Sequence, residues 1–206
     1  MRKILLLASI VAFFASCSSK PKFELEVNIT NNDSLINKQF VIAQKIDGKV
    51  VYSDTVKIKK KNFVLRIPKQ GNTLLTTRVL ESRVSDVIMA VDGEQSQLII
   101  DGNKTYISGT PINDDLQAFY NGNDSVTSLI AQLSQEYKDD PALLRQKRNL
   151  IYKENTDRII AFIKKNVDNP VGEYYFLTNY IMFPDARKEE MHSFASKKLK
   201  KELRLE

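Results

Sequence analysis

Few side chains in this sequence could carry catalysis or bind a transition metal. The 206 residues include one His, one Cys and no Trp. A single Cys cannot form an internal disulfide, a two-cysteine redox motif or a thiolate zinc site. One His and one Cys together also fall short of the ligand sets that transition metals need. These counts predict a chain that uses no metal and no cofactor.

The remaining candidates for acid–base chemistry are His192 and two pairs of aspartates. His192 follows Met191 in a charged, helical pattern, which favours a solvated position on the surface. The pairs Asp114-Asp115 and Asp139-Asp140 are adjacent in sequence, and adjacent residues do not face each other on a helix. Both pairs stand where we expect helices to begin, which favours capping over catalysis. Phosphate-loop, nucleophile-elbow and dinucleotide motifs are also absent from the sequence, so we expect no enzyme.

One basic run is a candidate binding surface. Its members are Lys57, Lys59, Lys60 and Lys61. Lysines that alternate with apolar residues are typical of the solvent face of a strand, and the same charges could contact an anion or a membrane surface. The formal net charge is +6, and the excess lies in the first half: residues 17–110 hold 14 basic and 10 acidic side chains, whereas residues 111–206 hold 15 of each.

The N-terminus has the pattern of a secretion signal. Arg2 and Lys3 precede an apolar run over residues 4–14, which is too short for a stable membrane-spanning helix and ends in small residues. Phe14-Ala15-Ser16-Cys17 resembles a bacterial lipobox, although Leu is commoner at the position of Phe14. We therefore expect a signal peptide over residues 1–16, lipidation at Cys17 and a tether over residues 17–22. The alternative is a secreted protein whose Cys17 lies near the cleavage site by chance.

Export and lipidation would decide location and partners. A lipid-modified Cys17 would hold the protein on a membrane, and export would exclude nucleic acid as a partner. The tether Ser18 to Lys22 is basic and lacks an acidic run. We therefore expect an outer-membrane protein that faces the periplasm and has an envelope protein as its partner.

The body predicts an α+β protein with a β domain over residues 23–109 and a helical region over residues 110–206. Apolar and polar residues alternate from Phe23 to Thr30, Asp47-Gly48 is a strong hairpin signal, and further short strands follow at regular spacing. Seven or eight such strands predict an antiparallel β-sandwich or an open barrel.

Helical spacing replaces the alternation after Gly109. A capping side chain precedes a proline at Thr110-Pro111, Asp140-Pro141 and Asn169-Pro170, and each of these pairs predicts a helix start. A last helix is expected from Asp185 through Leu199. The polar segment 121–125 (Asn-Gly-Asn-Asp-Ser) predicts a linker between two helices.

The segment 107–119 (Ile-Ser-Gly-Thr-Pro-Ile-Asn-Asp-Asp-Leu-Gln-Ala-Phe) suggests a family. Together with the hairpin over residues 54–63 and the helix around residues 160–170, it resembles a domain of unknown function found N-terminal to secreted thioredoxin-like proteins. The likeness covers roughly residues 23–183. Members usually continue into a thioredoxin fold with a Trp-Cys-x-x-Cys site, but this sequence has no Trp and no second Cys, so no catalytic residue is carried over. The resemblance therefore implies a stand-alone or a truncated form.

Together these observations favour a lipid-anchored envelope protein that acts as a non-catalytic interaction or ligand-binding module. One alternative is a truncated or degenerate thioredoxin-like oxidoreductase that lacks its catalytic domain. Another is a glycan or peptide binder that serves nutrient uptake.

Overall fold

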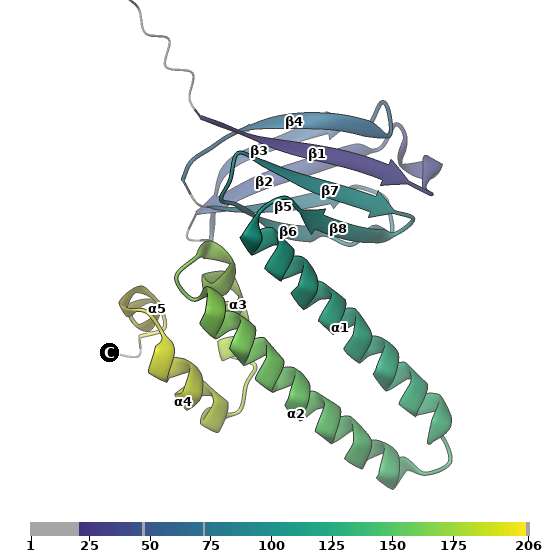
Figure 1. Cartoon of the computed structure of the whole chain (residues 1–206), viewed down its shortest axis with the longest axis vertical. Coiled ribbons are helices and arrows are strands. Elements are labelled where there is room, and N and C mark those ends of the chain that lie inside the picture. The colour runs from purple at the N-terminus through teal and green to yellow at the C-terminus, as the bar shows by residue number, and fades with distance from the viewer. Residues whose placement is uncertain (1–20, 47, 72, 205–206) are drawn as a thin grey trace, which may run out of the picture.

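The computed structural model describes residues 21–46, 48–71 and 73–204 of the chain (Figure 1). The predicted signal peptide, Cys17 and residues 17–20 of the tether lie outside the described residues. The strands are Lys22–Thr30 (β1), Gln39–Ile46 (β2), Lys49–Lys57 (β3), Asn62–Pro68 (β4), Thr73–Val79 (β5), Val87–Val91 (β6), Gln95–Asp101 (β7) and Lys104–Ser108 (β8). The helices are Pro111–Glu136 (α1), Pro141–Asn166 (α2), Pro170–Tyr180 (α3), Asp185–Phe194 (α4) and Lys197–Glu202 (α5), and a 3₁₀ turn covers Asp33–Leu35 (η1).

The strands form two four-stranded sheets, which confirms the predicted α+β fold and its sandwich. Their orders are β4-β1-β7-β8 and β3-β2-β5-β6, and the sheets do not close into a barrel. One pairing departs from the antiparallel expectation, because β1 lies parallel to β7 with Val27 opposite Leu98. Between β1 and β7 the chain forms the four strands of the other sheet, and a connection of this length permits parallel pairing. Hydrophobic alternation does not encode strand direction, so the sequence could not predict this.

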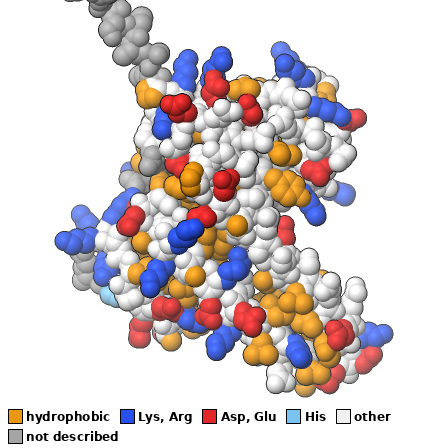
Figure 2. Space-filling view, viewed as in Figure 1, with side chains coloured by type: hydrophobic (Ala, Val, Ile, Leu, Met, Phe, Trp, Pro, Cys, Tyr) orange, Lys and Arg blue, Asp and Glu red, His pale blue; other side chains and the backbone are white. Residues whose placement is uncertain are grey.

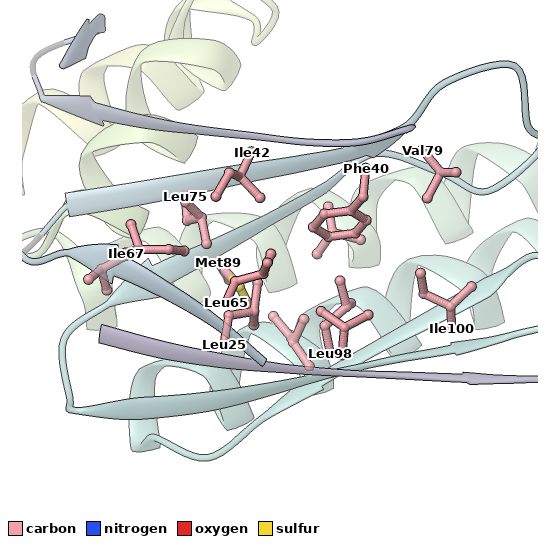
Figure 3. Packing of buried hydrophobic residues seen from close by; sticks show 14 of the residues in the cluster. Leu25, Phe40, Ile42, Leu65, Ile67, Leu75, Val79, Met89, Leu98 and Ile100 are labelled. Atoms are coloured by element: carbon pink, nitrogen blue, oxygen red, sulfur yellow. The ribbon is translucent and has the colours of Figure 1, made fainter. Parts of the chain in front are cut away.

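The core of the sandwich comes from the alternating apolar positions. Phe23, Leu25, Val27 and Ile29 of β1 are buried while their polar neighbours face outward. Figure 3 shows side chains from both sheets pointing toward one another, among them Leu25, Ile42, Leu75 and Leu98. Full burial of each such side chain contributes about 1.5–3 kcal/mol to folding. The sandwich is therefore a rigid base for the helices.

A tight turn at Gly109 joins the sandwich to α1. Gly109 has a φ of +108°, and a Cβ at this position would lie 3.1 Å from the Cα of Ser96. The next residue, Thr110, caps α1 as predicted, its hydroxyl accepting a hydrogen bond from the Asn113 N–H at 3.3 Å. Glycine is needed here both for the left-handed backbone and for the close approach.

The helical half departs from the sequence predictions in two places. The expected linker over residues 121–125 lies inside α1, which runs without interruption to Glu136. The last expected helix is divided, because α4 ends at Phe194 and Ser196 then caps α5 through the Leu199 N–H. Asp140 and Asn169 cap α2 and α3 as predicted. Figure 1 shows α1 and α2 as a long antiparallel pair projecting from the sandwich, with α3, α4 and α5 packed near its base.

Candidate interaction surfaces

The four lysines of the predicted binding surface lie at the end of β3 and on the turn that leads to β4, here together called the basic turn (Lys57, Lys59, Lys60 and Lys61). All four are exposed, while Ile58 between them is buried and holds the turn in place. The Ile58 N–H donates to the Lys38 carbonyl at 2.9 Å, and the Asn37 N–H donates to the Ile58 carbonyl at 2.7 Å. Lys61 also forms an ion pair with Asp33 at 2.5 Å. The lysines of the basic turn are therefore exposed to solvent, while its backbone is held by hydrogen bonds and by the buried Ile58.

The basic turn lies at the end of the sandwich opposite the start of β1. β4 runs antiparallel to β1, with Pro68 opposite Lys22 and Asn62 opposite Asn28. At about 3.3 Å per residue, the turn before Asn62 is therefore about 20 Å or more along the sheet from Lys22. Any contact that the basic turn makes is made far from where the tether reaches the fold.

The aspartates proposed as acid–base candidates form capping hydrogen bonds or ion pairs, and His192 is partly exposed. An oxygen of Asp114 accepts a hydrogen bond from the Gly109 N–H at 3.2 Å, and Asp115 pairs with Lys165 at 2.6 Å. Asp140 accepts from the Leu143 N–H at 3.0 Å as the cap of α2. His192 is half-buried in the last turn of α4. These interactions agree with the capping interpretation for Asp114 and Asp140.

The described residues contain neither a metal-binding cluster nor a membrane-spanning helix. They contain no group of three or more His, Cys, Asp or Glu side chains arranged to hold a metal ion. Within the same residues, no helix is both long enough and apolar enough to cross a membrane.

The structure contains a concave surface between the sandwich and the C-terminal helices, here called the groove. Its volume is about 440 Å³. Ile46 and Leu74 contribute apolar surface from the sheet, and Tyr174 and Leu177 do so from α3. At its rim, Lys198 of α5 donates to Glu173 at 2.7 Å. An apolar floor with a few charged groups at the edge is typical of sites that bind small or extended ligands.

Two other concave surfaces have a polar character. A cavity of about 540 Å³ at the far end of the sandwich is bordered by Asn31, Asn32 and Glu81. Its amides already bond to neighbouring loops, since Asn31 donates to Asp101 and Asn32 to the Gly102 carbonyl, both at 2.7 Å. The second, of about 470 Å³, lies along the middle of α1 beside β6 and β8.

The most conspicuous surface belongs to residues 121–157 of α1 and α2, here called the arm. None of these described residues is buried, although Phe119 and Ile160 on either side are. The part of α1 from residue 121 to 136 is about 24 Å long at 1.5 Å per residue. Figure 2 shows hydrophobic side chains gathered at the surface of the arm. A helix pair of this length without a buried side chain is left with apolar surface to cover.

The two helices of the arm meet along a heptad seam. Val126, Ile130, Leu133 and Tyr137 recur at intervals of three and four and are half-buried. On α2, Leu144 and Ile151 occupy the equivalent positions, and Arg148 donates to the Ser134 hydroxyl at 2.6 Å. The seam side chains are only half-buried by the partner helix, so a further layer over them would bury more apolar surface.

One flank of the arm is apolar beyond this seam. Leu129 and Leu150 are 42% and 55% exposed, and Leu143 lies one heptad before Leu150. In the antiparallel register of the seam, these three leucines fall on the same side of the helix pair. They form, with Leu133, the surface here called the arm face.

Arg158 connects α1 and α2 at the base of the arm, and its contacts account for an α1 that continues through residues 121–125. Its guanidinium donates to the Phe119 carbonyl at 3.0 Å, to Asn155 at 2.7 Å and to Asn123, and lies 4.8 Å from the centre of the Phe119 ring. Burial lowers the pKa of Arg158. A Cβ at Gly122 would lie 2.5 Å from Nη1 of Arg158, so glycine opens the space that this side chain fills. The polar segment therefore serves a long-range contact, which local propensity could not predict.

Aromatic rings join the arm to the sandwich and to α3. Phe119 stacks on Phe162 with ring centres 4.2 Å apart, and Tyr175 meets both rings edge-on at 5.0 and 5.5 Å. Tyr120 donates to the Ile88 carbonyl of β6 at 3.0 Å. Burial, with the neighbouring Tyr120 and Tyr174, raises the pKa of Tyr175. This junction fixes the direction in which the arm leaves the sandwich.

No family model, curated protein or solved structure matches this chain. The predicted linker over residues 121–125 divides the arm, so the sequence analysis does not find the arm face. The heptad spacing from Val126 to Tyr137 was the signal that could have found it.

Proposed function

We propose that the protein is a lipid-anchored envelope protein that acts as a non-catalytic interaction module, with the arm as its docking surface. The observation that carries this is the arm face, where Leu129 and Leu150 remain exposed on a helix pair that buries no side chain between residues 121 and 157. Contiguous exposed apolar surface of this kind marks sites of protein interaction. The aromatic junction and Arg158 fix the base of the arm, so its direction from the sandwich is set before docking.

The lipid anchor is the second part of the proposal. With Cys17 lipidated, residues 17–22 would span at most about 20 Å between membrane and fold. β1 begins at Lys22, so the adjacent end of the sandwich would face the membrane and the basic turn would face away. The lysines would then be available to an anionic envelope component, not to the headgroups around the anchor. An outer-membrane position facing the periplasm is part of the same proposal.

The proposal includes a relationship to the domain that precedes secreted thioredoxin-like proteins, which rests on the sequence of segment 107–119. In such proteins the catalytic cysteines belong to the separate thioredoxin fold, which leaves a binding role for the preceding domain. By analogy with that domain, we propose that this chain is an interaction module.

The groove favours a second candidate function, the binding of a peptide or glycan. Ile46, Leu74 and Tyr174 would contact an apolar or ring-shaped group, and the charged rim would bind polar ends. Thermal-shift screening of the full chain against peptides and oligosaccharides tests this function. A Leu177→Lys variant, at a half-buried position of the groove, should lose any stabilisation that a ligand produces.

Two experiments test the main proposal. A Cys17→Ser variant should move from the membrane fraction to the soluble fraction, and mass spectrometry of the wild-type N-terminal peptide should show acyl chains on Cys17. A photo-cross-linking amino acid at Leu150 in growing cells should then give a discrete protein adduct. The matched control is Val64 on β4, which is 50% exposed and far from the arm along the chain. Equal cross-linking at both positions would refute the arm as a docking surface.

A further inference from the structure

The charges on the arm divide between its two helices except at its base, where α2 also carries Glu154 and Asp157. From residue 121 to 136, α1 carries the acids Asp124 and Glu136 and no base. From residue 141 to 153, α2 carries Arg145, Lys147, Arg148 and Lys153 and no acid. Beyond that base, an acidic stretch of α1 and a basic stretch of α2 share one apolar face and form a surface complementary to itself.

Two of these charges flank the arm face directly. Glu136 and Lys147 are exposed, and the register of the seam places both on the side of Leu129 and Leu150. They lie at similar heights on the arm, because Ser134 contacts Arg148 across the helix pair. Each arm therefore presents leucines bordered by an acid on one helix and a base on the other.

A two-fold axis parallel to the helices would match these features between two arms. Such an axis places α1 of one copy over α2 of the other in antiparallel orientation. Leu129 then faces Leu150, and Glu136 faces Lys147, with each contact made twice. The other face-to-face arrangement places α1 over α1 and α2 over α2, which would juxtapose like charges. The charges therefore favour the arrangement that places α1 of one copy over α2 of the other.

We propose that the arm binds the arm of a second copy of this chain to form an antiparallel four-helix bundle. The inference rests on the proposed function, since it names the partner of the same docking surface. The second hairpin supplies the layer that the half-buried seam lacks, and four antiparallel helices are a stable arrangement for such a core. Both sandwiches lie at the same end of the bundle, so both Cys17 anchors can reach one membrane.

The test is a charge exchange measured on the full chain in mild detergent, with the mass of the complex obtained by native mass spectrometry. Wild type should have twice the mass of one chain. Glu136→Lys brings two lysines together at each contact, and Lys147→Glu brings two acids together, so each variant alone should dimerise about tenfold more weakly. An equimolar mixture of the two should regain the wild-type affinity as a heterodimer, because every contact then pairs opposite charges.

Controls separate this inference from the proposed function. Lys153→Glu changes the same charge on α2 away from the arm face and should leave the dimer unchanged. Circular dichroism should show that all variants keep wild-type helix content. A wild-type mass of one chain, or a mixture no better than its components, would overturn the self-pairing. If Leu150 cross-links to a different protein while the mass stays that of one chain, the docking surface stands and the self-pairing fails. If neither cross-linking nor dimerisation occurs, both fail.

Discussion

Asn113 should be the most sensitive polar residue at the joint between the sandwich and α1. Its buried side chain accepts from the Ala90 N–H at 2.7 Å, donates to the Ala90 carbonyl at 3.0 Å and donates to the Ser96 hydroxyl at 2.9 Å. β6 is the last strand of its sheet, so Ala90 has no further strand to bond. Asn113 therefore replaces a missing strand and connects both sheets to α1.

The Asn113→Ala variant would leave both peptide groups of Ala90 without their partner in a buried place. An unsatisfied buried group costs about 1–3 kcal/mol, so the free energy of unfolding should fall by about 3–4 kcal/mol in total. Asn113→Asp should cost at least as much, because it removes both donated hydrogen bonds and introduces a buried carboxylate.

Urea unfolding of the full chain, followed by circular dichroism, measures this loss. Asn121→Ala is the matched control, because Asn121 lies in the same helix and its exposed side chain accepts only from Gln117 at 2.8 Å. That variant should change the free energy of unfolding by less than about 0.5 kcal/mol. Hydrogen exchange at the Ala90 amide should accelerate only in the Asn113 variants. An Asn113→Ala protein as stable as the control would refute the reasoning.

Three further predictions test other parts of the molecule. Gly122→Ala should destabilise the chain, because the added Cβ displaces Arg158. In an Arg158→Ala background the same substitution should stabilise the chain by about 1 kcal/mol, because alanine has the higher helix propensity. Urea unfolding of wild type, the two single variants and the double variant should show this change of sign. Replacing all four lysines of the basic turn by Gln should leave the full chain in the membrane fraction, and its release would contradict the proposed orientation. Because burial raises the pKa of Tyr175 in the fold, its contribution to stability is complete below the tyrosine pKa of the unfolded chain, about 10, and is lost as pH rises above it. Tyr175→Phe should therefore lose less stability on alkaline titration, and identical pH profiles would contradict this.

Features that depend on neighbouring residues were well predicted from the sequence. The alternation from Phe23 to Ile29 placed β1, and the cap-plus-proline pairs at Thr110, Asp140 and Asn169 placed three helix starts. These signals involve residues within one helical turn or one strand, so they can be recognised from the local sequence.

Features that depend on distant residues were not predicted. The β1–β7 pairing joins segments about 70 positions apart, as in Val27 opposite Leu98, and nothing in either strand specifies its direction. The helix through Gly122 depends on Arg158, which lies 35 positions from its hydrogen-bonding partner Asn123. The arm face was not predicted for the same reason, because it forms only when α1 is continuous and lies beside α2.

Hydrogen exchange of the arm tests the central claim most directly. The amides of residues 124–136 and 141–155 should exchange quickly in the dilute, purified full chain, because no side chain there is buried. In native membranes the same amides should be protected at least about tenfold by the docked partner, while the strands of the sandwich remain unchanged. Equal exchange of the arm in both states would show that nothing covers it, and would contradict its role as the docking surface.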